Sequence, residues 1–242
     1  MIEPVRSLPF GTTRSRVTGQ YALITPDTHV WAPLPGWKNA QAVTHISPEM
    51  GARFAQYTVV LGGGAASAPV RLEIEHFFYV LSGRIQLTIA GGKRELSEGQ
   101  FAFIPAGDLY QITTRESAET EVARLALFEK RLHLGPAAPP AHVGDQKSVA
   151  AESFQGDPAL RLQTLLPVDP CFDMAVNLFT YDPGGHLPQV EVHVMEHGLL
   201  MLDGTGIYRL GDEWFPVQRG DVIWMASYCP QWFVAMGKSP AR

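Results

Sequence analysis

A long internal repeat constrains the fold of this chain more than any other feature. The segment "EHFFYVLSGRIQLTIAGGKRELSEGQFAFIPAGDLYQ" begins at Glu75, and "EHGLLMLDGTGIYRLGDEWFPVQRGDVIWMASYCPQ" begins at Glu196. One shift of 121 residues relates four identities: Glu75 to Glu196, His76 to His197, Gly83 to Gly204, and Gly99 to Gly220. Solenoid repeats are shorter, at roughly 20 to 50 residues. The spacing therefore predicts two copies of a whole domain.

Each copy reads as a β-rich domain. The 242 residues include 23 Gly and 19 Pro, and short apolar runs between them indicate many strands with little helix. Residues 133–150 are Pro/Ala-rich and lack periodicity, which indicates a linker. We therefore expect an all-β chain with a first domain over 1–132, a linker over 133–150 and a second domain over 151–242. The Gly-rich stretch 61–69 lacks the Lys of a phosphate loop and predicts a turn.

Composition narrows the possible partners. The net charge is −5 and no run of basic residues is present, so we expect no nucleic acid and no membrane among the partners. The start of the sequence has no apolar core like that of a signal peptide, and no apolar run reaches the length of a membrane span. The two cysteines, Cys171 and Cys229, suggest no disulfide framework. These features together predict a cytoplasmic location.

The stretch "EVHVMEHG", residues 191–198, carries the candidate chemistry. His193, Glu196 and His197 form H-x-x-E-H, which on a helix would be a zinc-protease signature. Valines at 190, 192 and 194 alternate with polar residues instead, and that period of two favours a half-buried strand. On a strand, Glu191, His193 and His197 share one face. Glu196 has the opposite parity, so we expect it to face away from them.

The spacing of these residues resembles the two motifs of the cupin family. Gly185, Glu191, His193, His197 and Gly204 fit the first motif, and Gly220, Ala226, Tyr228 and Gln231 fit the second. In the first copy, Val70 and Leu72 stand at the positions of Glu191 and His193, and Tyr110 stands at that of Gln231. The resemblance implies two tandem cupin barrels, a bicupin of double-stranded β-helix (jelly-roll) type. It also implies metal ligands in the second copy only.

The donor set predicts the class of metal. Inward residues of a small β-barrel can surround one ion, and we expect Glu191, His193, His197 and Gln231 to do so. Two imidazoles with two oxygen donors favour Mn²⁺ or Fe²⁺, and the geometry leaves Zn²⁺ and Ni²⁺ open. Purely structural roles for some of the candidate residues also stay open. Gln231 could form a hydrogen bond inside the barrel, His76 is expected to be structural, and Cys229 is expected to be a buried thiol.

Further stretches, among them "ALITPD", "GARF", "FDMAVNLFTYDPGG" and "GTGIYRLGDEWFPVQRGD", resemble the (S)-ureidoglycine aminohydrolase family. The resemblance runs from about residue 20 to residue 242. It implies a Mn²⁺-dependent enzyme of purine and allantoin catabolism that converts (S)-ureidoglycine to (S)-ureidoglycolate and ammonia. It further implies Tyr208 near the substrate and a homo-oligomer built from dimers.

One departure from that family concerns the closing strand of the second barrel. The strand expected over 120–132 would have its counterpart beyond residue 242, so we expect the second domain to lack it. The family's terminal tyrosine and lysine, the lysine being the expected catalytic base, fall in that stretch, which leaves the catalytic residues unassigned. Two alternatives therefore stay open: another metal-cupin enzyme, such as a dioxygenase or decarboxylase of a small acid, and a non-catalytic bicupin that binds a small ligand.

Overall fold

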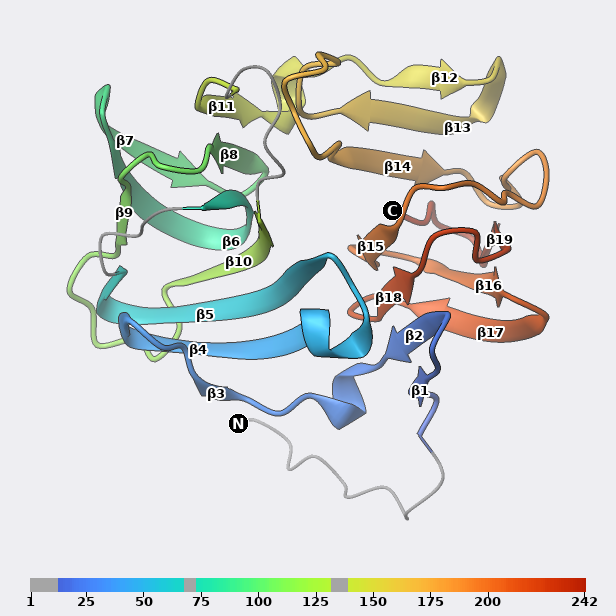
Figure 1. The fold of residues 1–242 in the computed structure, drawn as a ribbon, viewed down its shortest axis with the longest axis horizontal. Coiled ribbons are helices and arrows are strands. Elements are labelled where there is room, and N and C mark those ends of the chain that lie inside the picture. The colour runs from blue at the N-terminus through green and yellow to red at the C-terminus, as the bar shows by residue number, and fades with distance from the viewer. Residues whose placement is uncertain (1–12, 68–72, 132–138) are drawn as a thin grey trace.

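The structure is a computed structural model that describes residues 13–67, 73–131 and 139–242. Its regular structure is almost entirely β, so the all-β prediction is confirmed (Figure 1). Three short 3₁₀ helices are present among the described residues: η1 Pro26–Thr28, η2 Pro48–Met50 and η3 Gln146–Ser148. The strands are β1 Arg16–Val17, β2 Tyr21–Ile24, β3 Ala32–Pro33, β4 Trp37–Ile46, β5 Phe54–Ser67, β6 Ile74–Ile89, β7 Gly92–Ser97, β8 Gln100–Ile104, β9 Gln111–Thr113, β10 Ala123–Arg131, β11 His142–Asp145, β12 Glu152–Phe154, β13 Asp157–Thr164, β14 Asn177–Tyr181, β15 His197–Leu200, β16 Thr205–Leu210, β17 Glu213–Gln218, β18 Val222–Met225 and β19 Gln231–Met236.

The strands form two barrels side by side (Figure 1). The first barrel is one sheet with the order β11-β8-β6-β10-β5-β4-β3, in which β7 also pairs with β6, and β9 pairs with both β5 and β6. The second barrel combines three sheets: β1-β2-β18-β15, β12-β13-β14 and β17-β16-β19. Alternate residues of β6 illustrate why sheets of this kind bury two faces. Phe78 and Val80 point into the first barrel, while Phe77 and Tyr79 pack against residues of the second.

The two copies repeat the same backbone turns. Gly83 and Gly204 both have φ of 76°, and Gly99 and Gly220 have φ of 83° and 89°. A Cβ on Gly83 would lie 2.7 Å from the Cα of Ala123, and a Cβ on Gly204 would lie 2.6 Å from the Cα of Ala241. Ala241 therefore occupies the place that Ala123, the first residue of β10, has in the first copy. Between β14 and β15, no further strand is present in the described part of the chain.

The N-terminal strands belong to the second barrel. Strand β2 pairs with β18 in the register Ala22 to Trp224, far along the chain. Arg14 reinforces this contact, because its two terminal nitrogens bond to the Asp221 carboxylate at 2.6 and 2.9 Å. Asp221 is fully buried, and its carboxylate also accepts a hydrogen bond from the backbone amide of Gln218. A buried carboxylate needs such partners, so this pair fastens the N-terminal segment to the second barrel.

Two stretches differ from the sequence-based expectation. The Gly-rich stretch 61–69 is not a turn, since residues 61–67 extend β5; residues 68–69 lie outside the described residues. The reason is a close backbone approach: a Cβ on Gly63 would lie 2.4 Å from the carbonyl oxygen of Ser117. Within the expected linker, β11 and η3 are ordered, and β11 pairs with β8. The division into a first domain over 1–132, a linker over 133–150 and a second domain over 151–242 stays a prediction.

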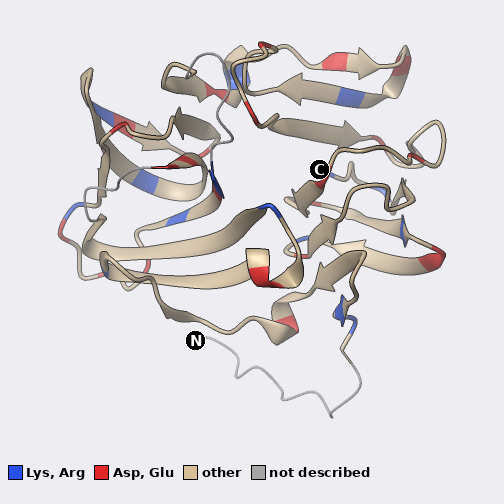
Figure 2. Ribbon diagram, in the orientation of Figure 1, with Lys and Arg blue, Asp and Glu red and all other residues tan. Residues whose placement is uncertain are grey.

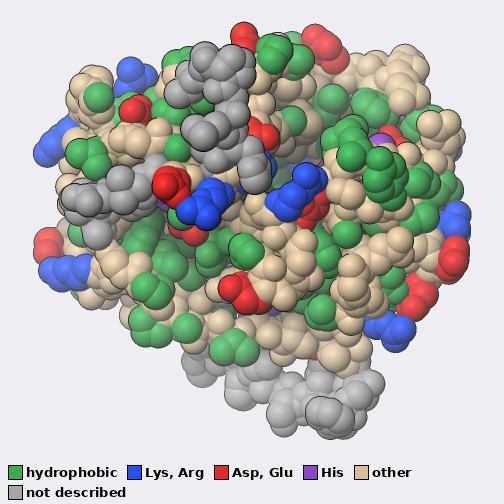
Figure 3. Space-filling view, viewed as in Figure 1, with side chains coloured by type: hydrophobic (Ala, Val, Ile, Leu, Met, Phe, Trp, Pro, Cys, Tyr) green, Lys and Arg blue, Asp and Glu red, His purple; other side chains and the backbone are tan. Residues whose placement is uncertain are grey.

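The surface carries no single-sign region on the face shown. Figure 2 shows Lys and Arg interspersed with Asp and Glu along the ribbon, and Figure 3 shows charged side chains scattered among hydrophobic and other ones. Among the described residues, no helix is both long and apolar enough to cross a membrane.

Glu75 lies in the contact between the barrels and gives a prediction for the pH dependence of stability. It is fully buried, neither carboxylate oxygen has a hydrogen-bond partner, and Lys130 Nζ is 4.0 Å away. Burial raises the pKa of Glu75 to about 7, with Lys130 opposing the shift. The folded protein thus binds this proton more tightly than the unfolded chain, so the contribution is present below pH 4.5 and is lost as the pH rises through 7.

Replacing Glu75 with Gln should therefore stabilise the protein at high pH only. We expect a gain of about 1 to 2 kcal/mol in the free energy of unfolding at pH 8 and little change at pH 4.5. Urea unfolding of the variant and the parent at both pH values measures the difference. An equal effect at the two pH values would show that the Glu75 carboxyl does not titrate in this way.

Candidate metal centre and active site

The four predicted ligand residues come together at one side of the second barrel. Glu191 and Gln231 form an isolated β-bridge, with Glu191 N to Gln231 O at 2.8 Å and Gln231 N to Glu191 O at 3.0 Å. Gln231 opens β19 and His197 opens β15. The carbonyl of His193 accepts a bond from the backbone amide of Tyr228 at 2.7 Å. Backbone hydrogen bonds therefore fix the positions of the Cα atoms from which these side chains extend.

The side chains meet around His193 Nε2. His197 Nε2 lies 3.3 Å from it, Gln231 Nε2 lies 3.2 Å from it, and Glu191 Oε2 lies 3.8 Å from it. Donor atoms that share one six-coordinate ion at about 2.1 Å lie about 3 Å from their neighbours. The His197 and Gln231 nitrogens lie near this separation from His193 Nε2, and the Glu191 oxygen lies farther away.

The local backbone differs from the predicted strand. Apart from the bridge at Glu191, residues 189–195 form no strand, and the alternating valines are not half-buried. Val190, Val192 and Val194 are exposed to 39%, 56% and 55%. Glu191 and His193 turn inward while the valines beside them stay exposed. The stretch pairs on one side only, through the bridge between Glu191 and Gln231. The prediction of a half-buried strand is wrong, while the shared face of Glu191 and His193 is seen.

The chemistry of the donor set fits a divalent cation. Burial, followed by the nearby His193 imidazole, lowers the pKa of His197 to about 4. His197 is therefore neutral at pH 7, which is the form that binds a metal. Among the described residues, no three His, Cys, Asp or Glu side chains are gathered closely enough about one point to hold an ion. The metal, the ligand roles and the choice of Mn²⁺ stay predictions.

Tyr208 touches the candidate site through Gln231. Its hydroxyl donates to Gln231 Oε1 at 3.2 Å, and its side chain is buried. Burial, followed by the charge of Glu191, raises the pKa of Tyr208, so the hydroxyl keeps its proton at neutral pH. Cys229 is buried as expected, and burial raises the pKa of its thiol. The Cys229 thiol therefore keeps its proton at neutral pH, as expected of a buried structural cysteine.

Glu196 faces away from the site, as its parity predicts. Its carboxylate accepts bonds from Trp224 Nε1 at 2.7 Å and from Arg53 Nε at 3.0 Å. The backbone amide of Arg53 adds bonds of 3.1 and 3.2 Å. Sequence reasoning missed these partners, because Arg53 lies 143 residues before Glu196 and belongs to the first barrel. Tyr228, which fits a motif position in the sequence, has a φ of 64°. Its backbone bond to His193 could not be predicted from that position.

The equivalent place in the first barrel holds a different cluster. His76 is buried, with Nε2 3.5 Å from Glu129 Oε1 and its ring against Tyr110 at 5.2 Å between centroids. The Tyr57 hydroxyl donates to Glu129 at 3.1 Å. The Glu129 carboxylate thus lies between His76 and Tyr57. This arrangement agrees with the expected structural role of His76.

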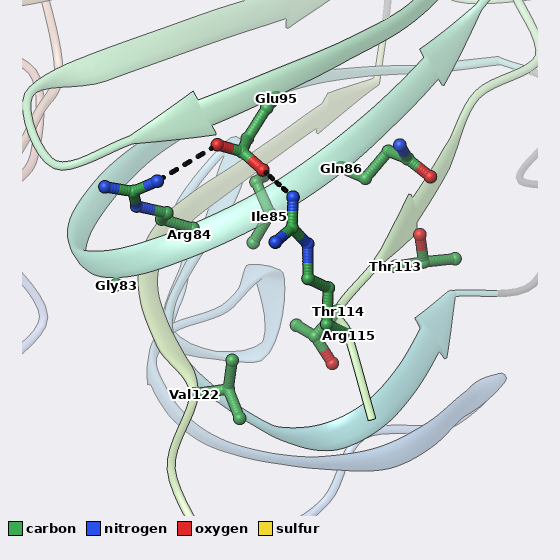
Figure 4. Close-up of a pocket in the computed structure, with 9 residues that line it drawn as sticks. All are labelled: Gly83, Arg84, Ile85, Gln86, Glu95, Thr113, Thr114, Arg115 and Val122. Carbon is green, nitrogen blue, oxygen red and sulfur yellow. Dashed lines mark hydrogen bonds and ion pairs between the residues drawn. The ribbon is translucent and has the colours of Figure 1, made fainter. Parts of the chain in front are cut away.

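A shallow depression on the first barrel does not coincide with the candidate site (Figure 4). It measures about 430 Å³ and contains none of the four predicted ligands. Glu95 lies between Arg84 and Arg115, with ion pairs of 3.3 and 2.9 Å, and both arginines are largely exposed. The single carboxylate of Glu95 lies between two guanidinium groups, so the lining keeps an excess of positive charge. Its lining residues are Gly83, Arg84, Ile85, Gln86, Glu95, Thr113, Thr114, Arg115 and Val122.

Comparison with known proteins gives the family. The model of the cupin domain matches residues 57–127 and 177–242, one match in each barrel. A protein of Oryza sativa subsp. japonica, named probable (S)-ureidoglycine aminohydrolase, is 38% identical over 98% of this chain and 75% of its own length. The (S)-ureidoglycine aminohydrolase of Arabidopsis thaliana is 36% identical over 98% of this chain and 78% of its own. The chain belongs to the (S)-ureidoglycine aminohydrolase family of cupin proteins.

A solved structure shares the fold of this chain over nearly its whole length. The crystal structure of protein Ylba from E. coli is 30% identical and superimposes with a TM-score of 0.80, covering 95% of this chain and 93% of the other. The prediction of a bicupin is therefore confirmed. Within this family fold, the second barrel holds the candidate ligands and the first holds the His76 cluster.

Proposed function

We propose that this chain is a Mn²⁺-dependent hydrolase that converts (S)-ureidoglycine to (S)-ureidoglycolate and ammonia. The observation that carries the proposal is the cluster of Glu191, His193, His197 and Gln231 around His193 Nε2. The substrate is inferred from the relatives in rice and Arabidopsis, which are named as (S)-ureidoglycine aminohydrolases. When bound, the ion would supply a Lewis-acidic centre with open positions for a small ligand.

The chain's own residues orient this centre. The imidazoles of His193 and His197 would each present Nε2, and Glu191 would add a carboxylate oxygen. Gln231 can present either end of its amide, since rotation by 180° exchanges oxygen and nitrogen. The protonated Tyr208 hydroxyl beside Gln231 is a hydrogen-bond partner for a small polar substrate. Ureidoglycine carries its amine, ureido group and carboxylate on one carbon, so orientation and choice of face are the tasks of the site.

The proposal predicts ammonia release that depends on Mn²⁺. Freshly prepared (S)-ureidoglycine is given to metal-free and to Mn²⁺-loaded protein, and each rate is corrected for spontaneous decay. We expect the loaded protein to be faster by about a thousandfold or more, because the residues that would hold the ion would also fix the orientation of the substrate. Protein loaded with Fe²⁺, Zn²⁺ or Ni²⁺ serves as the comparison for metal choice.

Three results would contradict this function. Protein with bound Mn²⁺ that releases no ammonia above background rules out the hydrolase. Oxygen consumption or carbon dioxide release from a small acid would favour the other metal-cupin enzymes, and tight ligand binding without turnover would favour a binding protein. The homo-oligomer built from dimers stays a prediction, which analytical ultracentrifugation checks.

A further inference from the structure

The strand that carries His197 contacts the first barrel on both sides of that residue. Neighbouring residues of an extended chain face opposite ways, so Glu196 and Gly198 share the face that His197 does not use. Glu196 contacts Arg53, and Gly198 packs on Phe54 and Gln56. His197 points the other way, toward His193.

The contact at Glu196 is strong and largely shielded from solvent. The Glu196 side chain is only 7% exposed, although that of Arg53 is 60% exposed. Its carboxylate accepts bonds from Arg53 N, Arg53 Nε and Trp224 Nε1, so three donors from two elements hold it. Trp224 is itself buried in an apolar cluster that includes Ile46 and Ala52 of the first barrel. Charge-assisted bonds of this kind restrict the position of the residue that they hold.

The contact at Gly198 leaves no room for a side chain. A Cβ at this position would lie 2.5 Å from Gln56 Oε1 and 2.6 Å from Phe54 Cε2. Gln56 is almost fully buried, so it cannot move aside into solvent. Gly198 also pairs with Trp224 across β15 and β18, directly beside the pair of His197 with Met225. Any movement of β15 away from the first barrel would therefore displace His197.

We propose that the first barrel positions His197 for metal binding, through Arg53 at Glu196 and through Phe54 and Gln56 at Gly198. This inference rests on the proposed function, because it needs the metal to bind at His197. Arg53, Phe54 and Gln56 are positioning residues and touch no predicted ligand. Mutation of an outer residue that orients a metal ligand typically lowers metal affinity by about 10- to 100-fold. The metal affinity of the second barrel thus depends on the first.

The test compares Arg53→Ala and Gly198→Ala with matched controls elsewhere. Arg84→Ala removes another exposed arginine of the first barrel, 72% exposed against 60% for Arg53, that also pairs with one glutamate. Gly91→Ala adds a Cβ that meets no atom within 4 Å. The dissociation constant for Mn²⁺ is measured by calorimetry, and hydrogen exchange of the β15 amides is measured by mass spectrometry on the metal-free proteins.

The expected result separates positioning from general stability. Arg53→Ala and Gly198→Ala should each raise the dissociation constant by about tenfold and speed exchange in β15, while the controls stay within about twofold of the parent. Arg53→Lys, which keeps the charge, should recover part of the affinity. If Gly198→Ala does not fold, Arg53→Ala still decides, because its backbone amide keeps a bond to Glu196.

Each other outcome has a definite meaning. A parent that binds Mn²⁺ together with an Arg53→Ala variant of unchanged affinity and unchanged β15 exchange overturns this inference and leaves the proposed function intact. A parent that binds no Mn²⁺ overturns the proposed function and this inference with it. A lower melting temperature with unchanged Mn²⁺ affinity would show that Arg53 acts on stability alone, which also overturns it.

Discussion

Replacement of His193 with alanine is expected to remove metal binding and to lower the rate of ammonia release by about a thousandfold or more. His193 is the side chain around which the others gather, at 3.3 Å from His197, 3.2 Å from Gln231 and 3.8 Å from Glu191. Without its imidazole, the remaining donors no longer share a neighbour. A thousandfold loss corresponds to about 4 kcal/mol of transition-state stabilisation.

The measurement pairs two readouts on one preparation. Metal content after loading and dialysis is determined by mass spectrometry, and ammonia release is followed with corrected background. His186→Ala is the matched control, because His186 lies in the same barrel with its ring against Trp232 and touches none of the predicted ligands. A His193→Ala protein with the metal content and rate of the parent would place the chemistry elsewhere.

Replacement of Gly83 with alanine is expected to give the largest loss of stability, several kcal/mol in the free energy of unfolding. Its φ of 76° already disfavours a side chain, at about 1 kcal/mol. The added Cβ would also lie 2.0 Å from the carbonyl oxygen of Val122 and 2.7 Å from the Cα of Ala123. Both atoms belong to backbone that leads into β10, the strand between β5 and β6. That strand would have to shift, which adds about 2 to 3 kcal/mol.

Two other glycines separate the effect of the positive φ from the effect of the steric contact. Gly92 has φ of 109° and no atom within 4 Å of an added Cβ, so Gly92→Ala reports backbone strain alone. Gly91 has neither strain nor contact, and Gly91→Ala should be nearly neutral. Urea unfolding of the three variants, followed by tryptophan fluorescence, gives the comparison. If Gly83→Ala costs no more than Gly92→Ala, the close approach of Val122 carries no energetic weight.

The repeat could be read from the sequence because its marks are local. Turn glycines need positive φ wherever they occur, so Gly83 and Gly204 keep their spacing, and the structure gives both the same φ. The shared face of Glu191 and His193 likewise follows from parity. Local patterns of this kind predict a β fold in two copies and the grouping of candidate ligands without knowledge of distant contacts.

What the sequence could not predict depends on distant partners. Residues 189–194 alternate like a strand, yet pairing needs neighbours on the sheet, and only Glu191 finds one. The Gly-rich stretch 61–67 continues β5 because Ser117 passes close by, which no local pattern records. The bonds between Arg53 and Glu196 join the two barrels, and nothing near either residue in the sequence indicates the other.

The pairing of β2 with β18 has a consequence for synthesis of the chain. Arg14 and Asp221 are 207 positions apart, so the first of these partners leaves the ribosome long before the second exists. Until then, the buried face of β2, with Tyr21 and Leu23, has no sheet to join. The first barrel can close on its own strands meanwhile. The second barrel forms last, and its β1-β2-β18-β15 sheet is the slow, non-local step of folding that exposes strand edges to aggregation.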